Sequence, residues 1–429
     1  MIFLALIFVT VMALMGAPIF VVISSYAMLG FFVSDITLAS MIVDIYDAFS
    51  NKPLLYTIPI FTFAGYILAE SKTSFRIVNL SKTLLGWLPG GLAIVSLSAC
   101  AFFTAFTGAS GVTIIALGGI LLPALTEGKY REKFSLGLLT SSGSLGLLFA
   151  PSLPILIYGA VSETSIIQLF VAGFLPGVLL IVLLSIYSIF TAKKTRVPKA
   201  PFSFVKVGNA LSAAKWELFI PVIIIGGLFS GFVTLGEVAC ITVAYTLIIE
   251  VFIYKDIKIK HIPLMMKRSM VLVGGILIIM GSAYGLTNYM IDAEIPIVIL
   301  DFMRDYISSK IIFLIVLNIF LLIVGCLLDI YSAILVVVPL ILPIAKSYGI
   351  DPVHLGIIFL ANLEIGYSTP PVGMNLFIAS FRFKKSIISV YGAAIPFIVI
   401  LLIGLLIITY LPQLSLGLIK YFGIETITL

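Results

Sequence analysis

The chain alternates long runs of apolar residues with short polar segments along its whole length. Several runs approach or reach the roughly 20 residues that a helix needs to cross a bilayer. Examples are 219–232, 241–253, 271–284 and 387–410. The pattern predicts an all-α polytopic membrane protein embedded in a lipid bilayer, and it leaves no room for a sizeable soluble domain.

Residues 1–52 are expected to form a transmembrane helix followed by an interfacial arm. No basic residue precedes the first apolar run and no small-residue cleavage site follows it, so we interpret it as a retained helix and not as a signal peptide. The Gly16-Ala17-Pro18 sequence predicts a kink in this helix, because proline removes a helical hydrogen bond.

Four proline or glycine positions recur along the chain at a constant offset of 220 residues. A shared register over more than fifty residues indicates an internal repeat, since chance matches of proline and glycine would not keep it. The matched pairs are Pro123 with Pro343, Gly146 with Gly366, Pro151 with Pro371, and Pro176 with Pro396.

Each copy is predicted to contain a first helix, an amphipathic stretch, a two-armed hairpin, a helix broken at its middle, and a last helix. If each hairpin returns to its own side, each copy crosses the membrane three times, and this odd number makes the copies inverted. The expected organisation is a first repeat at 53–191 with hairpin 88–126 and broken helix 131–160, a cytoplasmic loop and central helix pair at 192–267, a second repeat at 268–412 with hairpin 310–347 and broken helix 352–380, and a tail at 413–429.

Charge changes the picture through its distribution. Only 10% of the residues are charged, and most of the 25 lysines and arginines fall on one side if the N-terminus is cytoplasmic and the C-terminus periplasmic. The basic loops lack the aromatic signature of nucleic-acid binding, so we expect no nucleic-acid partner. The three cysteines lie in apolar segments without CxxC spacing, which indicates neither a disulfide nor a metal site.

Other function classes fit the sequence poorly. An intramembrane enzyme would need a catalytic motif, but the chain contains no HExxH and no GxSxG sequence and only 2 histidines. We therefore predict a protein that is not an enzyme. A channel stays open as an alternative to a carrier.

The interrupted helices carry the functional prediction. Broken backbone at bilayer depth persists only where protein, water or a ligand satisfies its polar groups. Half-helix N-termini attract anions and freed carbonyls coordinate Na⁺, so four converging breaks predict an ion-coupled carrier of anionic solutes.

Two polar clusters mark these breaks. In the first, the tip around Thr107, Gly108 and Ser110 faces the run Ser141 to Ser144; the alternative is small-residue helix packing. The second combines Asp329 and Ser332 with Asn362, Glu364, Gly366, Ser368, Thr369 and Pro370. Asp329 and Glu364 would be buried acids costing at least about 2.5 kcal/mol each unless paired or protonated, and the alternative for both is a structural pair with a helix N-terminus or hydroxyl.

The strings at these positions resemble one known family. Residues 61–191 and 310–412 are similar to the large membrane subunit of the tripartite ATP-independent periplasmic (TRAP) transporters, in the ion transporter superfamily. The resemblance covers nearly the full chain and is carried by FFTAFTGASGVT at 102–113, Leu328-Asp329, GIDPVH at 349–354 and NLEIGYSTPPVG at 362–373.

The resemblance implies an elevator mechanism, in which a transport domain of hairpins and broken helices slides against a scaffold, driven by Na⁺ as coupling ion and without any other cofactor. It implies residence in a bacterial or archaeal cytoplasmic membrane, with two partners: a small four-helix membrane subunit and a soluble periplasmic substrate-binding protein. A stand-alone dicarboxylate carrier of the same superfamily remains an alternative, against which the GIDPVH string argues.

The family's ion sites transfer to positions in both repeats. Na⁺ would be bound at Gly108, Ser110, Ser142, Gly143, Ser144, Asn362, Gly366, Thr369 and Pro370. We expect a small carboxylate solute to meet Ser141, Asp329, Ser332, Glu364 and Ser368. Many family members have an apolar residue in place of Glu364, so the resemblance does not assign a role to this residue.

Overall fold

The computed structural model describes residues 2–50, 53–195, 197, 202–230, 232–307 and 309–424, and residues 425–429 of the expected tail lie outside this part. Within it the regular structure is helical and contains no strand. Eight helices are long and apolar enough to cross a membrane, or nine spans if one bent helix pair is counted. The predicted all-α polytopic fold is confirmed. The eight are Ser110–Glu127, Ile166–Thr195, Phe204–Ser230, Leu235–Ile253, Ile259–Asp292, Lys310–Leu327, Ile330–Ser347 and Ile387–Tyr410.

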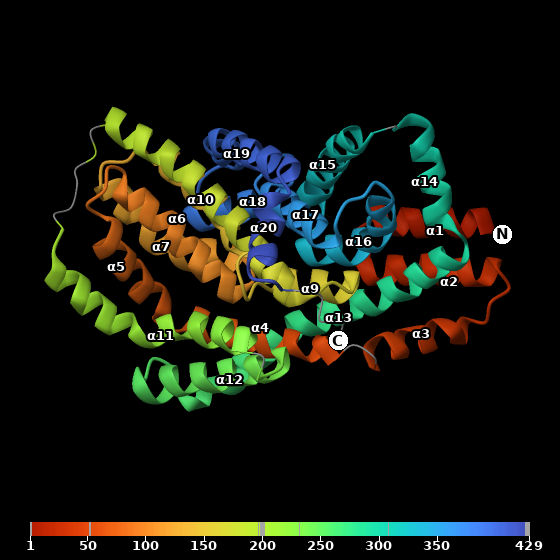
Figure 1. Ribbon diagram of the computed structural model, residues 1–429, viewed down its shortest axis with the longest axis horizontal. Coiled ribbons are helices and arrows are strands. Elements are labelled where there is room, and N and C mark those ends of the chain that lie inside the picture. Colours follow the sequence, from red (N-terminus) through yellow and green to blue (C-terminus); the bar gives the residue numbers. More distant parts are fainter. Residues whose placement is uncertain are drawn as a thin grey trace.

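The N-terminal region differs from the single kinked helix expected there. It contains α1 (Ile2–Leu14), α2 (Ile19–Val33) and α3 (Leu38–Ser50), and α1 lies beside α2 (Figure 1). The hydroxyl groups of Thr10 and Tyr26 are 2.7 Å apart, whereas a continuous helix would separate residues this far apart in sequence by about 24 Å. Gly16 has φ +86°, so the chain reverses at this glycine.

The region expected to be the first repeat, residues 53–191, folds as a series of helices. A short 3₁₀ helix at Pro53–Tyr56 precedes α4, and a 3₁₀ turn at Leu145–Leu148 separates the two arms of the broken helix. The helices are α4 (Thr57–Glu70), α5 (Thr73–Leu85), α6 (Gly91–Thr107), α7 (Ser110–Glu127), α8 (Glu132–Ser142), α9 (Leu153–Ser162) and α10 (Ile166–Thr195).

Two helices join the repeats within 192–267, where a cytoplasmic loop and a central helix pair are expected. Both helices are longer than expected, so the loop before them is shorter. These are α11 (Phe204–Ser230) and α12 (Leu235–Leu247), which a π-helical turn extends to Ile253. The second repeat begins earlier than predicted, at Ile262. Its helices are α13 (Ile262–Asp292), α14 (Ile295–Tyr306), α15 (Lys310–Leu327), α16 (Ile330–Ser347), α17 (Pro352–Gly366), α18 (Met374–Phe383) and α19 (Ile387–Tyr410), and α20 (Gln413–Tyr421) follows them.

The helix boundaries keep the offset seen in the sequence. The second hairpin arms, α7 and α16, begin and end at positions 220 residues apart, and so do the first residues of α8 and α17. The peptide bonds before Pro151 and Pro371 are both cis. Hairpin arms α7, α15 and α16 are long and apolar enough to count among the candidate spans. The re-entrant course of the hairpins and the inverted orientation of the repeats stay predictions.

Local chemistry explains where the helices break. α6 ends at Gly108, whose φ of +65° suits glycine, and a Cβ there would lie 2.7 Å from the Leu153 Cβ. Pro370 and Pro371 prevent α17 from continuing, and Gly373, with φ +48°, precedes α18. The first broken helix bends by 44° between its arms. Proline or glycine thus lies at these breaks, whereas the interruption between α15 and α16 consists of Leu328 and the N-cap residue Asp329.

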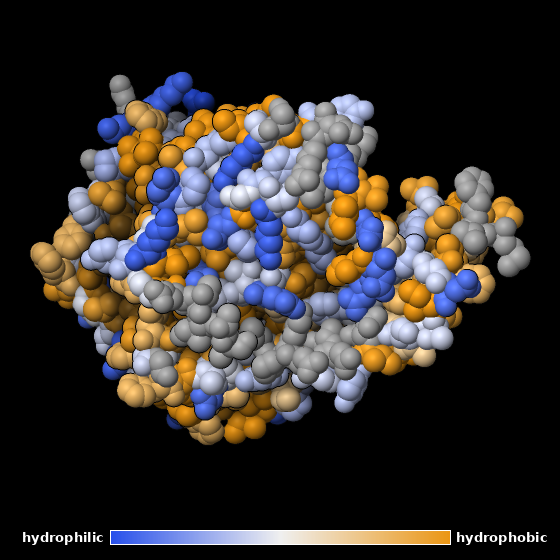
Figure 2. Space-filling model, turned by 45° about the vertical axis from the view of Figure 1, so that its right-hand side comes forward, coloured by the Kyte–Doolittle hydropathy of each residue, from blue (hydrophilic) through white to orange (hydrophobic). Residues whose placement is uncertain are grey.

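Helices from both repeats share one hydrophobic core. The aromatic ring of Phe134 on α8 packs against Tyr187 on α10 and Phe397 on α19, at centroid distances of 5.9 and 5.5 Å. The α6–α7 and α15–α16 hairpins lie toward opposite ends of the long axis (Figure 1). Figure 2 shows apolar side chains around the periphery of one face and long hydrophilic ones nearer its centre. Such an apolar periphery suits a protein solvated by lipid.

Candidate functional site

The breaks of the two repeats meet inside the molecule, as the sequence predicts. The Tyr331 hydroxyl in the second hairpin donates a hydrogen bond to the Gly108 carbonyl at the tip of the first, at 2.8 Å. Ser144, in the first broken helix, donates to the Glu364 carbonyl in the second at 3.2 Å. These two residues occupy equivalent positions of the repeats. The interrupted segments therefore form one polar centre from both halves of the chain.

Buried polar atoms without a hydrogen-bond partner gather at this centre. Among the described residues, most such atoms lie at or beside the helix breaks. An unsatisfied buried polar group costs about 1–3 kcal/mol, so a group of them indicates a site that a ligand completes. They belong to Thr107, Ser141, Ser152, Asn362, Glu364, Ser368 and Asn375.

In the first repeat, the hairpin tip packs closely on the broken helix. The Thr104 hydroxyl lies 2.5 Å from that of Thr113 and donates a hydrogen bond to the Gly143 carbonyl at 2.7 Å. A Cβ at Gly143 would lie 2.6 Å from the Ile114 side chain. Ser142 is fully buried beside the Cys100 thiol. The structure brings Gly108, Ser110, Ser142, Gly143 and Ser144 into one region, together with Thr104 and Thr113, which sequence reasoning missed.

In the second repeat, Asn362 is the centre of a buried amide network. Its Nδ2 donates hydrogen bonds to Asn318 Oδ1 at 2.7 Å and to the Ile358 carbonyl at 2.8 Å, while its Oδ1 has no partner. Asn318 in turn donates to Thr409 on α19 at 3.2 Å. An amide oxygen without a hydrogen-bond partner is the kind of ligand atom that a hard cation such as Na⁺ prefers. Asn318 and Thr409 gave no sequence signal, because both lie within long apolar runs.

Glycine and proline shape the backbone next to this network. A Cβ at Gly366 would lie 2.6 Å from the Gly325 carbonyl carbon, so α17 and the second hairpin touch backbone to backbone. Thr369 donates its hydroxyl hydrogen bond to the Ile365 carbonyl at 2.8 Å, directly before Pro370. The expected ion-binding positions Asn362, Gly366, Thr369 and Pro370 therefore surround a single break.

Asp329 and Ser332 engage each other and the start of α16. The Asp329 carboxylate accepts hydrogen bonds from the backbone N–H groups of Tyr331 and Ser332, both at 3.1 Å, and from the Ser332 hydroxyl. This is an N-cap, which stabilises a helix through its first unpaired N–H groups and its dipole. The structural alternative considered for Asp329 is thus present in this conformation.

Glu364, Ser141 and Ser368 are fully buried. Both carboxylate oxygens of Glu364 and both serine hydroxyls lack a partner. An isolated buried carboxylate is strongly unfavourable unless it is paired or protonated. These three residues consequently remain candidates for contact with a ligand.

Asn375 is a further buried residue of the centre that sequence reasoning missed. It lies in the first turn of α18, and its Oδ1 accepts a hydrogen bond from the Ser110 hydroxyl at 2.7 Å. Its Nδ2 is unpartnered. The only sequence signal was a polar residue two positions after the glycine that ends the break.

Comparison with known proteins decides the family. The family model described as "Tripartite ATP-independent periplasmic transporter, DctM component" matches residues 3–414. The chain belongs to the DctM family. It is 34% identical to the C4-dicarboxylate TRAP transporter large permease protein DctM of Vibrio cholerae over 96% of both chains. It is 32% identical to the ectoine/5-hydroxyectoine large permease protein UehC of Ruegeria pomeroyi, over 96% of this chain and 97% of the other.

A solved structure supports the fold of this chain. The YdaH transporter of Alcanivorax borkumensis superposes with a TM-score of 0.63 over 90% of this chain and 89% of the other, at 13% sequence identity. The family assignment also shows that the protein is the large permease component of a bacterial TRAP transporter and a multi-pass membrane protein. Its relatives are transporters and not enzymes, as the missing catalytic motifs predict.

This family member also has a buried ion-pair cluster away from the breaks. Arg76 on α5 pairs with Glu217 on α11, with Glu250 at 3.1 Å and with Asp256 at 2.6 Å, and the Tyr254 ring centroid lies 3.8 Å from its guanidinium carbon. Burial and the hydrogen bond to Glu217 raise the pKa of Tyr254 above its ordinary value. All three carboxylates accept donors, so this cluster anchors α5 against α11 and α12.

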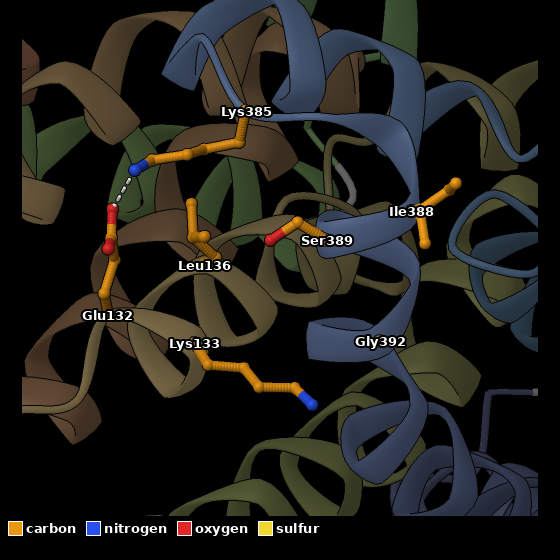
Figure 3. Close-up of a pocket in the computed structure, with 7 residues that line it drawn as sticks. All are labelled: Glu132, Lys133, Leu136, Lys385, Ile388, Ser389 and Gly392. Atoms are coloured by element: carbon orange, nitrogen blue, oxygen red, sulfur yellow. Dashed lines mark ion pairs between the residues drawn. The ribbon is translucent and has the colours of Figure 1, made fainter.

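A surface cavity of about 250 Å³ lies elsewhere, between the first turns of α8 and α19 (Figure 3). Lys385 pairs with Glu132 at its edge, at 2.5 Å, and Lys133 extends along the other side. Neither lysine is among the predicted site residues. The polar centre at the breaks is therefore distinct from this cavity.

Proposed function

We propose that this permease is the transport subunit of a Na⁺-coupled importer of organic acid solutes. The observation that supports it is the group of buried, unpartnered oxygen atoms at helix breaks in both repeats. Buried polar atoms without a partner destabilise the folded protein, whereas bound Na⁺ and a polar solute would satisfy them.

Na⁺ would be held at two places. One lies among Gly108, Ser110, Ser142, Gly143 and Ser144, and the other among Asn362, Gly366, Thr369 and Pro370. The free Asn362 Oδ1 and the carbonyls exposed by the breaks supply the oxygen ligands that hard cations require. Bound Na⁺ would place positive charge at the polar centre and favour an anionic solute there.

The solute would be a small organic acid. Relatives are named for C4-dicarboxylates, ectoine and isethionate, all of which carry an acidic group. The unpartnered hydroxyls of Ser141 and Ser368 would donate hydrogen bonds to it, and Glu364 would balance the positive charge of bound Na⁺. Asp329 and Ser332 would contribute by holding the second hairpin tip in place.

Transport would follow an elevator mechanism. Cross-repeat hydrogen bonds such as Tyr331 to Gly108 and Arg382 to Ile115 favour a transport domain that moves as one body. The Arg76 cluster would keep α5 fixed to the scaffold helices. Two partners complete the proposal: a small four-helix membrane subunit and a periplasmic binding protein. The N-terminus would lie in the cytoplasm and the C-terminus in the periplasm of a cytoplasmic membrane.

The test is uptake into proteoliposomes that contain this chain and its small subunit. Labelled succinate uptake would be measured with and without an inward Na⁺ gradient and with and without the cognate binding protein. Uptake that needs both supports the proposal. Na⁺-driven uptake without the binding protein would favour a stand-alone carrier, uptake indifferent to Na⁺ would contradict the ion sites, and non-saturable flux would indicate a channel.

A further inference from the structure

The surface cavity of about 250 Å³ between α8 and α19 is lined by both repeats. Glu132 and Lys133 line it from the first turn of α8, and Ser389 and Gly392 line it from α19. Lys385 borders it from the loop between α18 and α19. The cavity therefore presents hydrogen-bond donors from both halves of the chain to one small space.

The positive charge of this cavity is only partly neutralised. The Lys385 ammonium pairs with the Glu132 carboxylate at 2.5 Å, whereas no acceptor is found for Lys133 within the described residues. A Cβ placed at Gly392 would lie 3.6 Å from Lys133 Nζ, so this glycine leaves room for the ammonium beside the α19 backbone. Figure 3 shows the Ser389 hydroxyl between the two lysine side chains. Two ammonium groups against one carboxylate favour an anion here.

The surroundings of the cavity add to this positive potential. Arg131 and Lys384 are exposed, and each is next in sequence to a residue that lines the cavity. Arg131 is also the N-cap of α8 and supplies no side-chain acceptor, so the first N–H groups of this helix keep their partial positive charge. These basic residues belong to the side that the charge distribution predicts to be cytoplasmic. The cavity is thus expected at the headgroup level of the inner leaflet, which carries anionic lipids.

An exposed apolar stripe begins at the cavity and runs along α19. Ile388 borders the cavity and is 77% exposed, and the residues that follow it at helical spacing are about half exposed. These residues are Ile395, Val399, Ile403 and Leu406. From Ile388 to Leu406 the helix rises by about 27 Å, close to the roughly 30 Å of a bilayer's hydrocarbon core. The polar cavity therefore lies at the end of a surface that suits acyl chains.

We propose that this cavity binds the phosphate headgroup of an anionic phospholipid from the cytoplasmic leaflet. Lys133 and Lys385 donate charge-assisted hydrogen bonds to the phosphate oxygens, and the Ser389 hydroxyl adds a third donor. The acyl chains lie against the α19 stripe, whereas a dissolved phosphate has no apolar part to lie there. Because α8 and α19 belong to different repeats, the bound lipid connects the two halves of the chain. Its binding does not depend on Na⁺ coupling.

Three variants test the site. Lys133→Gln/Lys385→Gln removes both ammonium groups, and Gly392→Leu fills the cavity without changing its charge. Lys193→Gln/Lys194→Gln is the matched control, since it removes two exposed lysines from the last turn of α10, outside the cavity and on the same predicted side. Lys133→Gln alone removes an exposed, unpaired charge, and it replaces the double variant if that one does not fold.

The measurement is lipid binding to the purified, delipidated full-length chain in detergent, followed by native mass spectrometry. Dioleoylphosphatidylglycerol is the anionic probe, dioleoylphosphatidylcholine the zwitterionic one, and glycerol 3-phosphate the soluble headgroup. We expect the wild type to bind the phosphatidylglycerol at least about tenfold more tightly than the phosphatidylcholine. The double lysine variant and Gly392→Leu should lose this preference, whereas the α10 control should retain it. Thermal unfolding without added lipid shows which variants fold.

Three results would overturn the lipid site. Equal affinity of the wild type for the two phospholipids would show that headgroup charge is not recognised. A preference that persists in the lysine and glycine variants, or that is lost equally in the α10 control, would show that the cavity is not where the anionic lipid binds. Glycerol 3-phosphate that binds as tightly as the phosphatidylglycerol would make the cavity a site for soluble phosphate compounds and not for a lipid.

Discussion

The two repeats of this permease interrupt their helices at matched positions but place different side chains there. The first repeat uses hydroxyls and glycines, such as Ser142 and Gly143, and its hairpin tip at Ala109 has no side-chain cap. The second repeat places Asp329, Asn362 and Glu364 at its breaks, and it caps its own tip. Matching backbone therefore does not imply matching chemistry, and the polar centre has one self-capped and one open helix end.

The largest effects should be the same in both repeats, where backbone packs on backbone. A Cβ at Gly146 would lie 2.2 Å from the Ala101 carbonyl oxygen, and one at its mate Gly366 would lie 2.6 Å from the Gly325 carbonyl carbon. We expect Gly146→Ala and Gly366→Ala each to lower the free energy of unfolding by about 2–4 kcal/mol, because neither neighbour can move without shifting a helix. Thermal unfolding in detergent measures this.

Gly274→Ala on α13 is the control, since a Cβ there meets nothing within 4 Å. It should be neutral or stabilise by up to about 1 kcal/mol through helix propensity. Equal stability of all three variants would show that the close approach at the two breaks has no energetic weight.

The next effect should be confined to the second repeat. Asn362→Ala removes the unpartnered Oδ1 that we propose as a Na⁺ ligand, and it should raise the Na⁺ concentration needed for half-maximal uptake at least about tenfold. Asn318→Ala removes the same Asn318–Asn362 hydrogen bond but leaves that oxygen in place. If the two variants show the same Na⁺ dependence, Asn362 serves the network and not the ion.

A smaller effect should distinguish the two hairpin tips. Asp329→Ala removes the cap of α16 and should lower stability by about 1–2 kcal/mol in Na⁺-free buffer, since its two backbone bonds and the helix-dipole interaction are lost. Ala109→Asp should raise stability by a comparable amount at α7. Thermal unfolding of both variants tests this, and opposite signs are required; a loss in both would mean that the tip of α7 cannot accept a cap.

The smallest effect should appear where the repeats touch at equivalent positions. Ser144→Ala removes the hydrogen bond of 3.2 Å to the Glu364 carbonyl and should cost about 0.5–1.5 kcal/mol, because one uncharged bond is lost. Chemical unfolding can resolve a change of this size. A cost like that of the glycine variants would show that this single contact holds the repeats together.

The sequence predicted the all-α fold and the positions of the helix breaks for a clear physical reason. Proline and glycine act locally, so Pro151, Pro371 and Gly108 interrupt helices wherever the rest of the chain lies. It failed at Gly16, where a glycine and proline pair was interpreted as a kink although the chain reverses. Local glycine and proline residues determine where a helix ends. Packing between α1 and α2 determines the direction in which the chain continues.

The apolar pattern, the repeat and the motifs at 349–354 and 362–373 determined by themselves that this is a polytopic transporter, because hydropathy and turn chemistry are properties of short segments. Only the tertiary structure decided which polar groups are already satisfied. The Asp329 carboxylate accepts hydrogen bonds from the first turn of α16. Asn375, from a distant part of the chain, accepts a hydrogen bond from Ser110 at the N-terminus of α7. Hydrogen bonding between segments depends on where folding places them, and no pattern along the chain encodes that placement.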